Sequence, residues 1–318
     1  MIIGAIGKVI SMTTVFIGIP YWFWNSPLLT EESQTVSIYL HPDSTTESHL
    51  HAIETQISKN GGYGGVMINA MWLRGWDERV KPGKYDIDNK ITMGEAAEKF
   101  AIGAREDVKV VVPSHREVEF VAGQIASYTA ADSSEILQLI APEETRWKII
   151  PNTYNMWWEG NAEGAVNRLL KENDIWWTEK RIALAKAQGL TPEEATILAS
   201  IVQSETKDLS EAPTVAGLYL NRLRRGQLLQ ADPTVIYGLM PNFNGDITRV
   251  NLRDKDNLYN TYVINGLPPT PISMPTRSSL EAAIKNSPNE YLFFVADDKG
   301  RHIFSKTYNE HLEYVNLY

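Results

Sequence analysis

The sequence predicts an α+β protein that an N-terminal helix holds at a membrane. Four observations support this prediction. Strand-like alternation stands beside helical segments over residues 35–113, and a hairpin pattern closes the chain. Helical periodicity dominates residues 116–206, and an uncharged apolar stretch occupies the start of the chain.

The composition excludes several classes of protein. The 318 residues include nine Trp and fourteen Tyr and are 43% hydrophobic, which is enough to build packed cores. A net charge of −9 argues against nucleic acid as the main partner. There is no cysteine, so stability must come from apolar burial rather than disulfides. The six histidines form no H-E-x-x-H pair, and we expect neither a metal nor another cofactor.

The apolar N-terminal stretch has the features of a membrane anchor. Residues 9–30 carry no charge, and with the residues before them they are long enough to cross a hydrocarbon core of about 30 Å. Four aromatic residues at 21–24 suit the outer interface. Lys8 precedes the stretch and Glu31 follows it, so the positive-inside rule places the rest of the chain outside the cytoplasm. A cleaved signal peptide is the alternative, but no A-x-A site follows.

Further along, the pattern predicts elements of both kinds. A tether over 26–34 leads into a strand at 35–40, a helix at 46–58, a break at 60–65, a turn and strand at 80–88, a helix at 92–102 and a strand at 107–113. Predicted helices follow at 116–128, 133–140, 162–172, 177–188 and 191–206, with a loop at 151–154. The chain then continues with a helix at 213–224, one or two helical turns at 232–238, a helix at 279–285, and a hairpin formed by 291–295 and 302–304.

The helix over residues 191–206 puts one carboxylate on an apolar face. Thr191 is a good N-cap, and rotation of about 100° per residue turns Gln203 to the far side. One direction is shared by Leu198, Ile201, Val202 and Glu205. A carboxyl group held against apolar neighbours has a raised pKa, as a general acid requires. The alternative is that Glu205 ends the apolar stripe and reaches water, and periodicity alone leaves both open.

Six motifs occur in order in the second half of the chain. They are Leu198-Ala199-Ser200-Ile201-Val202-x-x-Glu205-Thr206, Tyr219-x-Asn221-Arg222-Leu223-x-x-Gly226, Leu229-Gln230-x-Asp232-Pro233-Thr234-Val235-x-Tyr237-Gly238, Tyr259-Asn260-Thr261-Tyr262, Gly266-Leu267-Pro268-Pro269-x-Pro271-Ile272 and Tyr291-Leu292-Phe293-Phe294-Val295-Ala296. Together they resemble the YceG-like family of endolytic murein (peptidoglycan) transglycosylases. Pro82-Gly83-Lys84-Tyr85 and the helix after it resemble the family's LysM-like module, and Pro151-Asn152-Thr153-Tyr154 resembles its P-[DN]-T-Y loop.

The resemblance implies a division of the chain into four parts. We expect a transmembrane anchor over residues 1–25, a LysM-like α+β module over 26–114, a helical linker region over 115–160 and a mixed α/β catalytic domain over 161–318. The protein would then be a single-pass protein of the bacterial plasma membrane whose catalytic domain is extracytoplasmic.

By the same resemblance, Glu205 aligns with the family's catalytic glutamate. A lytic transglycosylase uses the C6 hydroxyl of its own substrate as nucleophile and forms a 1,6-anhydro sugar, so one carboxyl group can act first as acid and then as base. Ordinary glycosidases need a second carboxylate. Many members of the family carry a second glutamate where this chain has Gln203.

Polar residues near Glu205 in the motifs are candidates for substrate binding. They are Gln230, Asp232, Thr234, Tyr237, Asn260, Thr261, Tyr262 and Arg222. Each has a structural alternative. Asp232 before Pro233 is an N-cap signature, Asn260 and Thr261 can cap a loop, and Arg222 either meets stem-peptide carboxylates or lies on a solvated helix face.

The expected function is endolytic cleavage of the MurNAc–GlcNAc β-1,4 bond in nascent strands near the membrane, which limits glycan length. The expected partners are peptidoglycan glycan strands and peptidoglycan synthases. Two alternatives remain. A hydrolytic muramidase would need a second carboxylate, for which the nearest residues are Asp208, Glu211, Asp232 and Asp246. A non-catalytic glycan-binding scaffold would need no acid.

Overall fold

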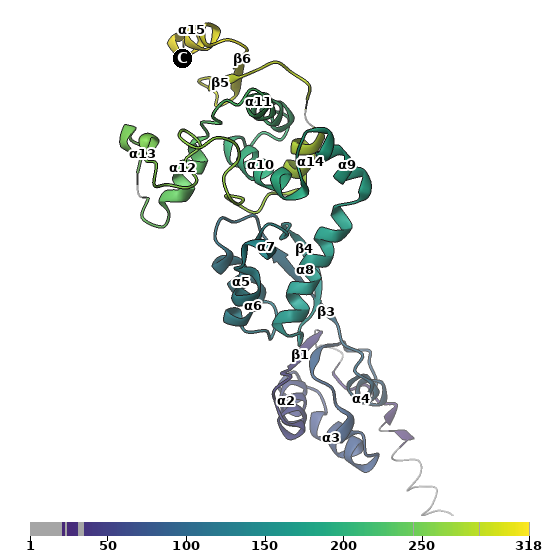
Figure 1. Cartoon of the computed structure of the whole chain (residues 1–318). Helices are drawn as coiled ribbons and strands as arrows, with labels where there is room; N and C mark the ends of the chain where they lie inside the picture. The colour runs from purple at the N-terminus through teal and green to yellow at the C-terminus, as the bar shows by residue number, and fades with distance from the viewer. Residues whose placement is uncertain (1–20, 23, 31–34, 244, 286, 318) are drawn as a thin grey trace, which may run out of the picture. The chain divides into compact units, whose positions relative to one another are not determined.

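The structure is a computed structural model that describes residues 21–22, 24–30, 35–243, 245–285 and 287–317 (Figure 1). Most of the predicted anchor lies outside these residues. Within them, no helix has both the length and the apolar character that a bilayer span requires. The chain forms two compact units. Unit 1 runs to Val110 and also takes in Ser127–Ala131 and Asn155–Asn161, and unit 2 consists of Val111–Ala126, Asp132–Tyr154 and the chain from Ala162 onward.

Unit 1 is built on a two-stranded antiparallel sheet with helices between and after its strands. Its elements are β1 (Val36–Leu40), α2 (Thr46–Lys59), α3 (Gly64–Leu73), the short 3₁₀ helix η1 (Asp77–Arg79), β2 (Gly83–Ile87) and α4 (Met93–Ile102). Val36 pairs with Ile87 and Leu40 with Gly83. Alternate residues of β1 are buried, because one face of the strand packs on the helices.

Helix α3 was not predicted from the sequence. The run Asn60–Gly65 indicated a break, and α2 does end at Lys59, but a second helix begins at Gly64 inside the run. A Cβ on Gly64 would stand 2.5 Å from the backbone oxygen of Glu54 in α2. This glycine therefore allows the two helices to approach closely, a use of glycine that a single sequence does not distinguish from a turn.

The predicted loop at residues 151–154 is wrong. Asn152–Trp157 forms β4, which pairs with β3 (Asp107–Val112) in a two-stranded sheet. Tyr154 and Met156 are buried while their neighbours are exposed, and the Tyr154 hydroxyl donates to the carbonyl of Ile150. The period-2 burial outweighs the turn tendency of Pro151 and Asn152, because strand formation lets the Tyr154 ring leave water.

Unit 2 is mainly helical. Its helices are α5 (Val118–Ala126), α6 (Ser133–Ile140), α7 (Glu143–Arg146), α8 (Ala162–Trp176), α9 (Glu179–Ala187), α10 (Pro192–Glu205), α11 (Ala212–Arg224), α12 (Asp232–Leu239), α13 (Arg249–Arg253), α14 (Arg277–Lys285) and α15 (Tyr308–Leu317). Helix α10 lies against α11 and α14 (Figure 1). Its residues from Ala195 to Val202 are all buried, and this cluster is the core that positions the end of α10.

A hairpin and a final helix complete unit 2. Strands β5 (Phe293–Ala296) and β6 (His302–Ser305) pair antiparallel, as the sequence predicted, with Phe293 opposite Ser305. His302 fixes the hairpin to the start of α11, since its backbone N–H donates to Glu211 Oε1 at 3.1 Å and its Nδ1 lies 2.8 Å from Glu211 Oε2. Helix α15, which the sequence did not predict, packs on both strands.

Candidate active site

Glu205 is the last residue of α10. The helix starts with a capping box, in which the Thr191 hydroxyl accepts from the Glu194 N–H and the Glu194 carboxylate accepts from the Thr191 N–H. Three to seven residues before Glu205, on the same face, Leu198, Ile201 and Val202 are fully buried. The helix is therefore fixed at both its start and its middle, and Glu205 emerges from the core where the helix stops.

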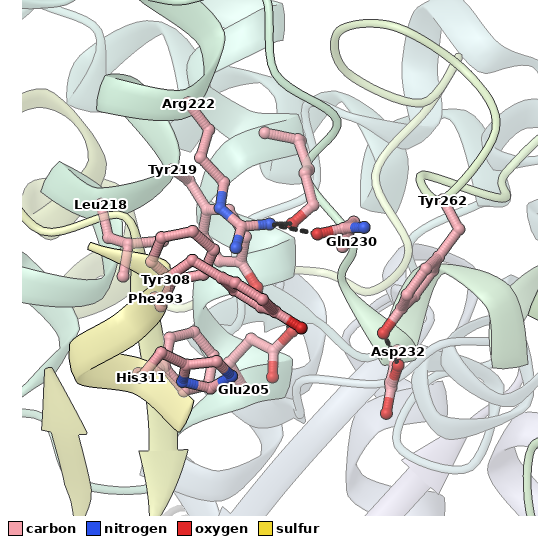
Figure 2. Close-up of a pocket in the computed structure, with 12 residues that line it drawn as sticks. Glu205, Leu218, Tyr219, Arg222, Gln230, Asp232, Tyr262, Phe293, Tyr308 and His311 are labelled. Atoms are coloured by element: carbon pink, nitrogen blue, oxygen red, sulfur yellow. Dashed lines mark hydrogen bonds between the residues drawn. The ribbon is translucent and has the colours of Figure 1, made fainter. Parts of the chain in front are cut away.

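A cavity of about 290 Å³ opens at Glu205. It is lined by Glu205, Leu218, Tyr219, Arg222, Leu229, Gln230, Asp232, Tyr262, Phe293, Phe294, Tyr308 and His311. Figure 2 shows Glu205 and His311 at one end of this cavity and the pair of Asp232 and Tyr262 across from them. The lining combines aromatic rings with a few polar groups, which is the usual character of a ligand pocket.

The surroundings of Glu205 raise the pKa of its carboxyl group to about 7. Burial is the main cause, and the negative charge of Asp232 adds to it. In the opposite direction, the Tyr219 hydroxyl donates to Oε1 at 2.7 Å and the Arg222 guanidinium attracts the carboxylate. Near neutral pH the group is therefore present in both protonation states, so it can release and take up a proton in one cycle.

Tyr219 and Arg222 are one helical turn apart on α11. Tyr219 is buried, and its own pKa is raised well above 10, mainly by burial and also by Glu205, so the hydroxyl remains a donor to the carboxyl group. The side chain of Arg222 is only 8% exposed and donates to the carbonyls of Leu228, Leu229 and Leu292 and to Gln230 Oε1.

One sequence-based interpretation of Arg222 is wrong: it does not lie on a solvated helix face, because the residue is buried. Arg222 lines the cavity, and its Nε and Nη1 donate to backbone carbonyls of the pocket wall. Contact with stem-peptide carboxylates stays a prediction. The structural effect of Arg222 is to join α11 to Leu292, just before β5, and to the loop before α12.

Gln230, Asp232 and Tyr262, three of the residues predicted to contact substrate, line the cavity. Gln230 has a φ of 54°, a left-handed conformation that is uncommon outside glycine. Its backbone N–H donates to Thr261 and its side chain accepts from Arg222, and these two bonds hold the strained residue at the pocket edge. Asp232 is not the N-cap of α12, because Ala231 occupies that position and no side chain caps the helix. Instead Asp232 Oδ1 accepts from the Tyr262 hydroxyl at 2.6 Å.

Four other candidates lie outside the cavity. Thr234 and Thr261 are fully buried and bond each other at 2.8 Å, which ties α12 to the loop at 257–262. Asn260 is also fully buried, and its amide donates to three carbonyls of residues 251–254, so its loop-capping alternative is observed. Tyr237 lines a separate cavity beside Arg146 and packs edge-on against Tyr259.

Gln203 lies away from Glu205, as the helical periodicity predicted. Its Nε2 donates to Ser114 Oγ at 2.6 Å, and its Oε1 accepts from the Thr276 N–H at 2.7 Å. It lines another cavity with Ser114. The amide therefore joins α10 to the segments at 114 and 276 without entering the Glu205 cavity.

Several lining residues were not singled out from the sequence. Tyr219 is part of a quoted motif, and its position three residues before Arg222 on a helix was a usable signal. Phe293 and Phe294 looked like ordinary strand residues. Tyr308 and His311 belong to α15, and no local pattern indicated that the end of the chain returns to the cavity.

The chemistry of the cavity centres on carboxyl groups. In the part of the chain that the structure describes, no group of three or more His, Cys, Asp or Glu side chains could hold a metal ion. Among the described lining residues, Asp232 is the carboxylate besides Glu205. Of the other residues considered for a second acid, Glu211 is bonded to His302, Asp208 accepts from the Ser210 N–H, and Asp246 is exposed. None of these three lines the cavity.

The fold and the sequence are similar to known proteins. The chain is 30% identical over 153 residues to an endolytic murein transglycosylase of Bacillus subtilis, covering 48% of this chain and 41% of that protein. It is 26% identical over 210 residues to an endolytic murein transglycosylase of Streptococcus pneumoniae, covering 62% of this chain and 37% of that protein. The chain thus spans about two fifths of the length of these curated relatives.

The crystal structure of a yceG-like protein from Listeria monocytogenes has a similar fold, with a TM-score of 0.57 and 23% sequence identity. This match covers 88% of the present chain and 98% of the other. The profile of the YceG-like family matches residues 44–317, which include the part of unit 1 after β1, unit 2 and the whole Glu205 cavity. The chain belongs to the YceG-like family.

Proposed function

We propose that this protein is a lytic transglycosylase that cleaves the MurNAc–GlcNAc β-1,4 bond of peptidoglycan and forms 1,6-anhydroMurNAc. The observation that carries this proposal is one half-buried carboxyl group, Glu205, with a pKa of about 7 in a cavity of mixed aromatic and polar lining. The proposal is supported by two relatives, from Bacillus subtilis and Streptococcus pneumoniae, which are both named endolytic murein transglycosylase.

In the proposed reaction Glu205 acts twice. The protonated carboxyl group first gives its proton to the glycosidic oxygen, and the bond from that oxygen to C1 of MurNAc breaks. The resulting carboxylate then takes the proton of the C6 hydroxyl as the C6 oxygen bonds to C1. The 1,6-anhydro ring closes, and Glu205 is again protonated. Tyr219 stabilises the carboxylate between the two steps through its 2.7 Å hydrogen bond.

Asp232 favours a second candidate, a hydrolytic muramidase, because it provides another carboxylate in the same cavity. The two reactions leave different products. Hydrolysis adds water and gives reducing ends, whereas intramolecular attack gives an anhydro end that lacks that water. Mass spectrometry of purified glycan strands digested by the protein distinguishes them, and reducing ends alone would reject the transglycosylase proposal.

Replacement of Glu205 tests the assignment of the acid. Glu205→Gln keeps the size of the side chain but supplies no acidic proton, and we expect product formation to fall by at least about 100-fold. Glu193→Gln is the matched control, since Glu193 is exposed on the first turn of the same helix. Anhydro product still formed by Glu205→Gln would contradict the mechanism. Retention of both fold and biological function by Glu205→Gln, with no product formed by the unmodified protein, would favour the glycan-binding scaffold.

We also propose that the protein acts at the membrane. Residues 1–25 would form a single anchor, with residues 26–114 as a LysM-like module, 115–160 as a linker and 161–318 as an extracytoplasmic catalytic domain. Support comes from the uncharged N-terminal stretch and from the order β1-α2-α3-β2 with antiparallel pairing in unit 1. Tethering would confine the cavity to nascent strands beside peptidoglycan synthases, and so limit glycan length.

Cell fractionation tests this placement. The full chain should sediment with membranes and resist extraction by salt, whereas a chain without residues 1–25 should be released. Release of the full chain by salt would reject the anchor and leave the proposal for Glu205 unaffected.

A further inference from the structure

The final helix brings one histidine into the Glu205 cavity. His311 of α15 lines the cavity with Tyr308, and Figure 2 shows it at the same end as Glu205. Its ring stacks on Phe293, with 5.3 Å between ring centroids and 21° between planes. The reaction proposed above gives this histidine no role.

A reciprocal cap holds the start of α15 and with it His311. The Thr307 hydroxyl accepts from the Glu310 N–H at 3.3 Å, and the Glu310 carboxylate accepts from the N–H groups of Lys306 and Thr307. The His311 N–H donates to the Thr307 carbonyl at 3.1 Å. Because His311 directly follows the capping glutamate, its place on the first turn is set by these bonds.

The two ring nitrogens of His311 differ in their surroundings. Nδ1 is buried and has no hydrogen-bond partner within the described chain. Nδ1 is unsatisfied in either tautomer, and because a buried N–H without an acceptor is the rarer case in folded proteins, we assign the proton of the neutral ring to Nε2. Nε2 is not enclosed in this way and bonds none of the described residues, so its N–H is available to a ligand.

The charges around the ring favour the neutral form. Burial lowers the pKa of His311, and the Arg222 guanidinium, which lies 5.2 Å from the Phe293 ring, lowers it further. A neutral donor also suits its neighbour Glu205, because an imidazolium in the cavity would favour the carboxylate and oppose its use as an acid. The ligand groups that match are neutral acceptors, such as the hydroxyl and N-acetyl oxygens of a saccharide.

We propose that His311 contacts the glycan in this cavity and that its Nε2–H donates a hydrogen bond to a sugar oxygen beside Glu205. The identity of the saccharide as peptidoglycan glycan rests on the proposed function. The C-terminal helix α15 thereby contributes Tyr308 and His311 to the binding site, next to Phe293 of β5.

Binding measured without turnover tests the contact directly. In the Glu205→Gln background, calorimetry with peptide-free MurNAc–GlcNAc strands gives Kd for three further changes at His311. His311→Phe keeps the stack on Phe293 but removes both nitrogens, and we expect binding about fivefold to tenfold weaker. His311→Gln places an amide near the position of Nε2 and should stay within about threefold of the parent.

His311→Asn is the matched control for the choice of nitrogen. Its shorter amide stands near Nδ1, so it should bind as weakly as His311→Phe. Leu312→Ala, at an exposed neighbour on the same helix, should leave Kd unchanged. In the active protein, His311→Phe should raise KM for the same strands several-fold with less change in kcat.

The outcomes separate the two proposals. Binding by His311→Phe within twofold of the parent, or rescue by Asn instead of Gln, would overturn the role of His311. If His311→Phe does not fold, the comparison of Gln with Asn still decides. If the unmodified protein forms no anhydro product while His311→Phe still weakens binding, the proposed reaction fails and the contact stands.

Discussion

The pKa of Glu205 is set by neighbours with opposing effects. Burial and Asp232 raise its pKa, while Tyr219 and Arg222 lower it, and the result is about 7. Without the hydrogen bond from Tyr219, the carboxylate would be less stable, so the group would be a weaker acid and would give up its proton more slowly. The tyrosine therefore sets how readily one residue can serve in both halves of the reaction.

Replacing Tyr219 by phenylalanine tests this balance. Tyr219→Phe removes the donor at 2.7 Å, so the carboxylate loses stabilisation and the pKa of Glu205 should rise by about one unit. The limb of the pH profile of kcat/KM that reports Glu205 should move to higher pH by that amount. Tyr63→Phe, at an exposed tyrosine of unit 1, is the control. An unmoved limb would show that the bond does not act on the acid.

The raised pKa of Glu205 also predicts a dependence of stability on pH. Its folded value of about 7 lies above the ordinary 4.5, so between these values the folded protein binds more protons at this site than the unfolded chain. The contribution of this group is fully present below pH 4.5 and is lost as pH rises through 7, by up to roughly 3 kcal/mol. Glu205→Gln has no such loss.

Urea unfolding of the original and the Glu205→Gln protein between pH 5 and 8 measures the effect. The difference in free energy of unfolding should shift in favour of the variant as pH rises. A constant difference across this range would mean that the carboxyl group is solvated in the folded protein.

At this scale, the sequence predicted the residue at the centre of the site better than its surroundings. The face on which Glu205 lies and the distal position of Gln203 follow from helical rotation, which is a local property, whereas the proposed role of Glu205 came from the family resemblance. Thr234, Asn260 and Thr261 share motifs with pocket residues, but their short side chains bond backbone groups inside the fold. Which way a motif residue points depends on packing of distant segments, and one sequence does not contain that information.

Among the elements, prediction succeeded where the pattern was periodic and failed where glycine or proline had two uses. Helix α6 was predicted with its observed bounds, Ser133–Ile140, because Asp132 caps it and its apolar residues recur regularly. Helix α3 and strand β4 were missed, since Gly64 and Pro151 also read as breaks. In both cases burial against another segment overrode the local tendency.

Gly238 in α12 offers a test of such a close contact. A Cβ there would stand 1.8 Å from Asn257 Oδ1, and Asn257 is held by bonds to Val235 and Tyr259. Gly238→Ala must displace this buried amide, so we expect the free energy of unfolding to fall by roughly 1–3 kcal/mol despite the better helix propensity of alanine.

Gly245→Ala is the matched control, because nothing lies within 4 Å of the added Cβ. It should change stability by less than about 0.5 kcal/mol. Equal effects of the two substitutions in thermal or urea unfolding would contradict the proposed close packing of Gly238 on Asn257.

For the whole molecule, the division into units does not follow the order of the chain. Residues 127–131 and 155–161 belong to unit 1, although the segments around them belong to unit 2. Within unit 1, Trp158 packs on Tyr39 with 5.1 Å between ring centroids, and Glu159 pairs with Arg105. Unit 1 therefore includes two segments, residues 127–131 and 155–161, that come later in the chain than the predicted module. Local sequence patterns could not indicate that these segments return to unit 1.

Substitution of Arg105 tests how much its ion pair with Glu159 stabilises the packing of residues 155–161 in unit 1. The side chain of Glu159 is only 8% exposed, so Arg105→Leu leaves a buried carboxylate without its partner and should lower the free energy of unfolding by roughly 3 kcal/mol. Adding Glu159→Leu removes that uncompensated charge and should recover most of the loss, since apolar residues can replace a buried ion pair at little cost. A double variant no more stable than Arg105→Leu would mean that Arg105 acts by packing on Trp157, which its guanidinium approaches to 5.1 Å, rather than by neutralising Glu159.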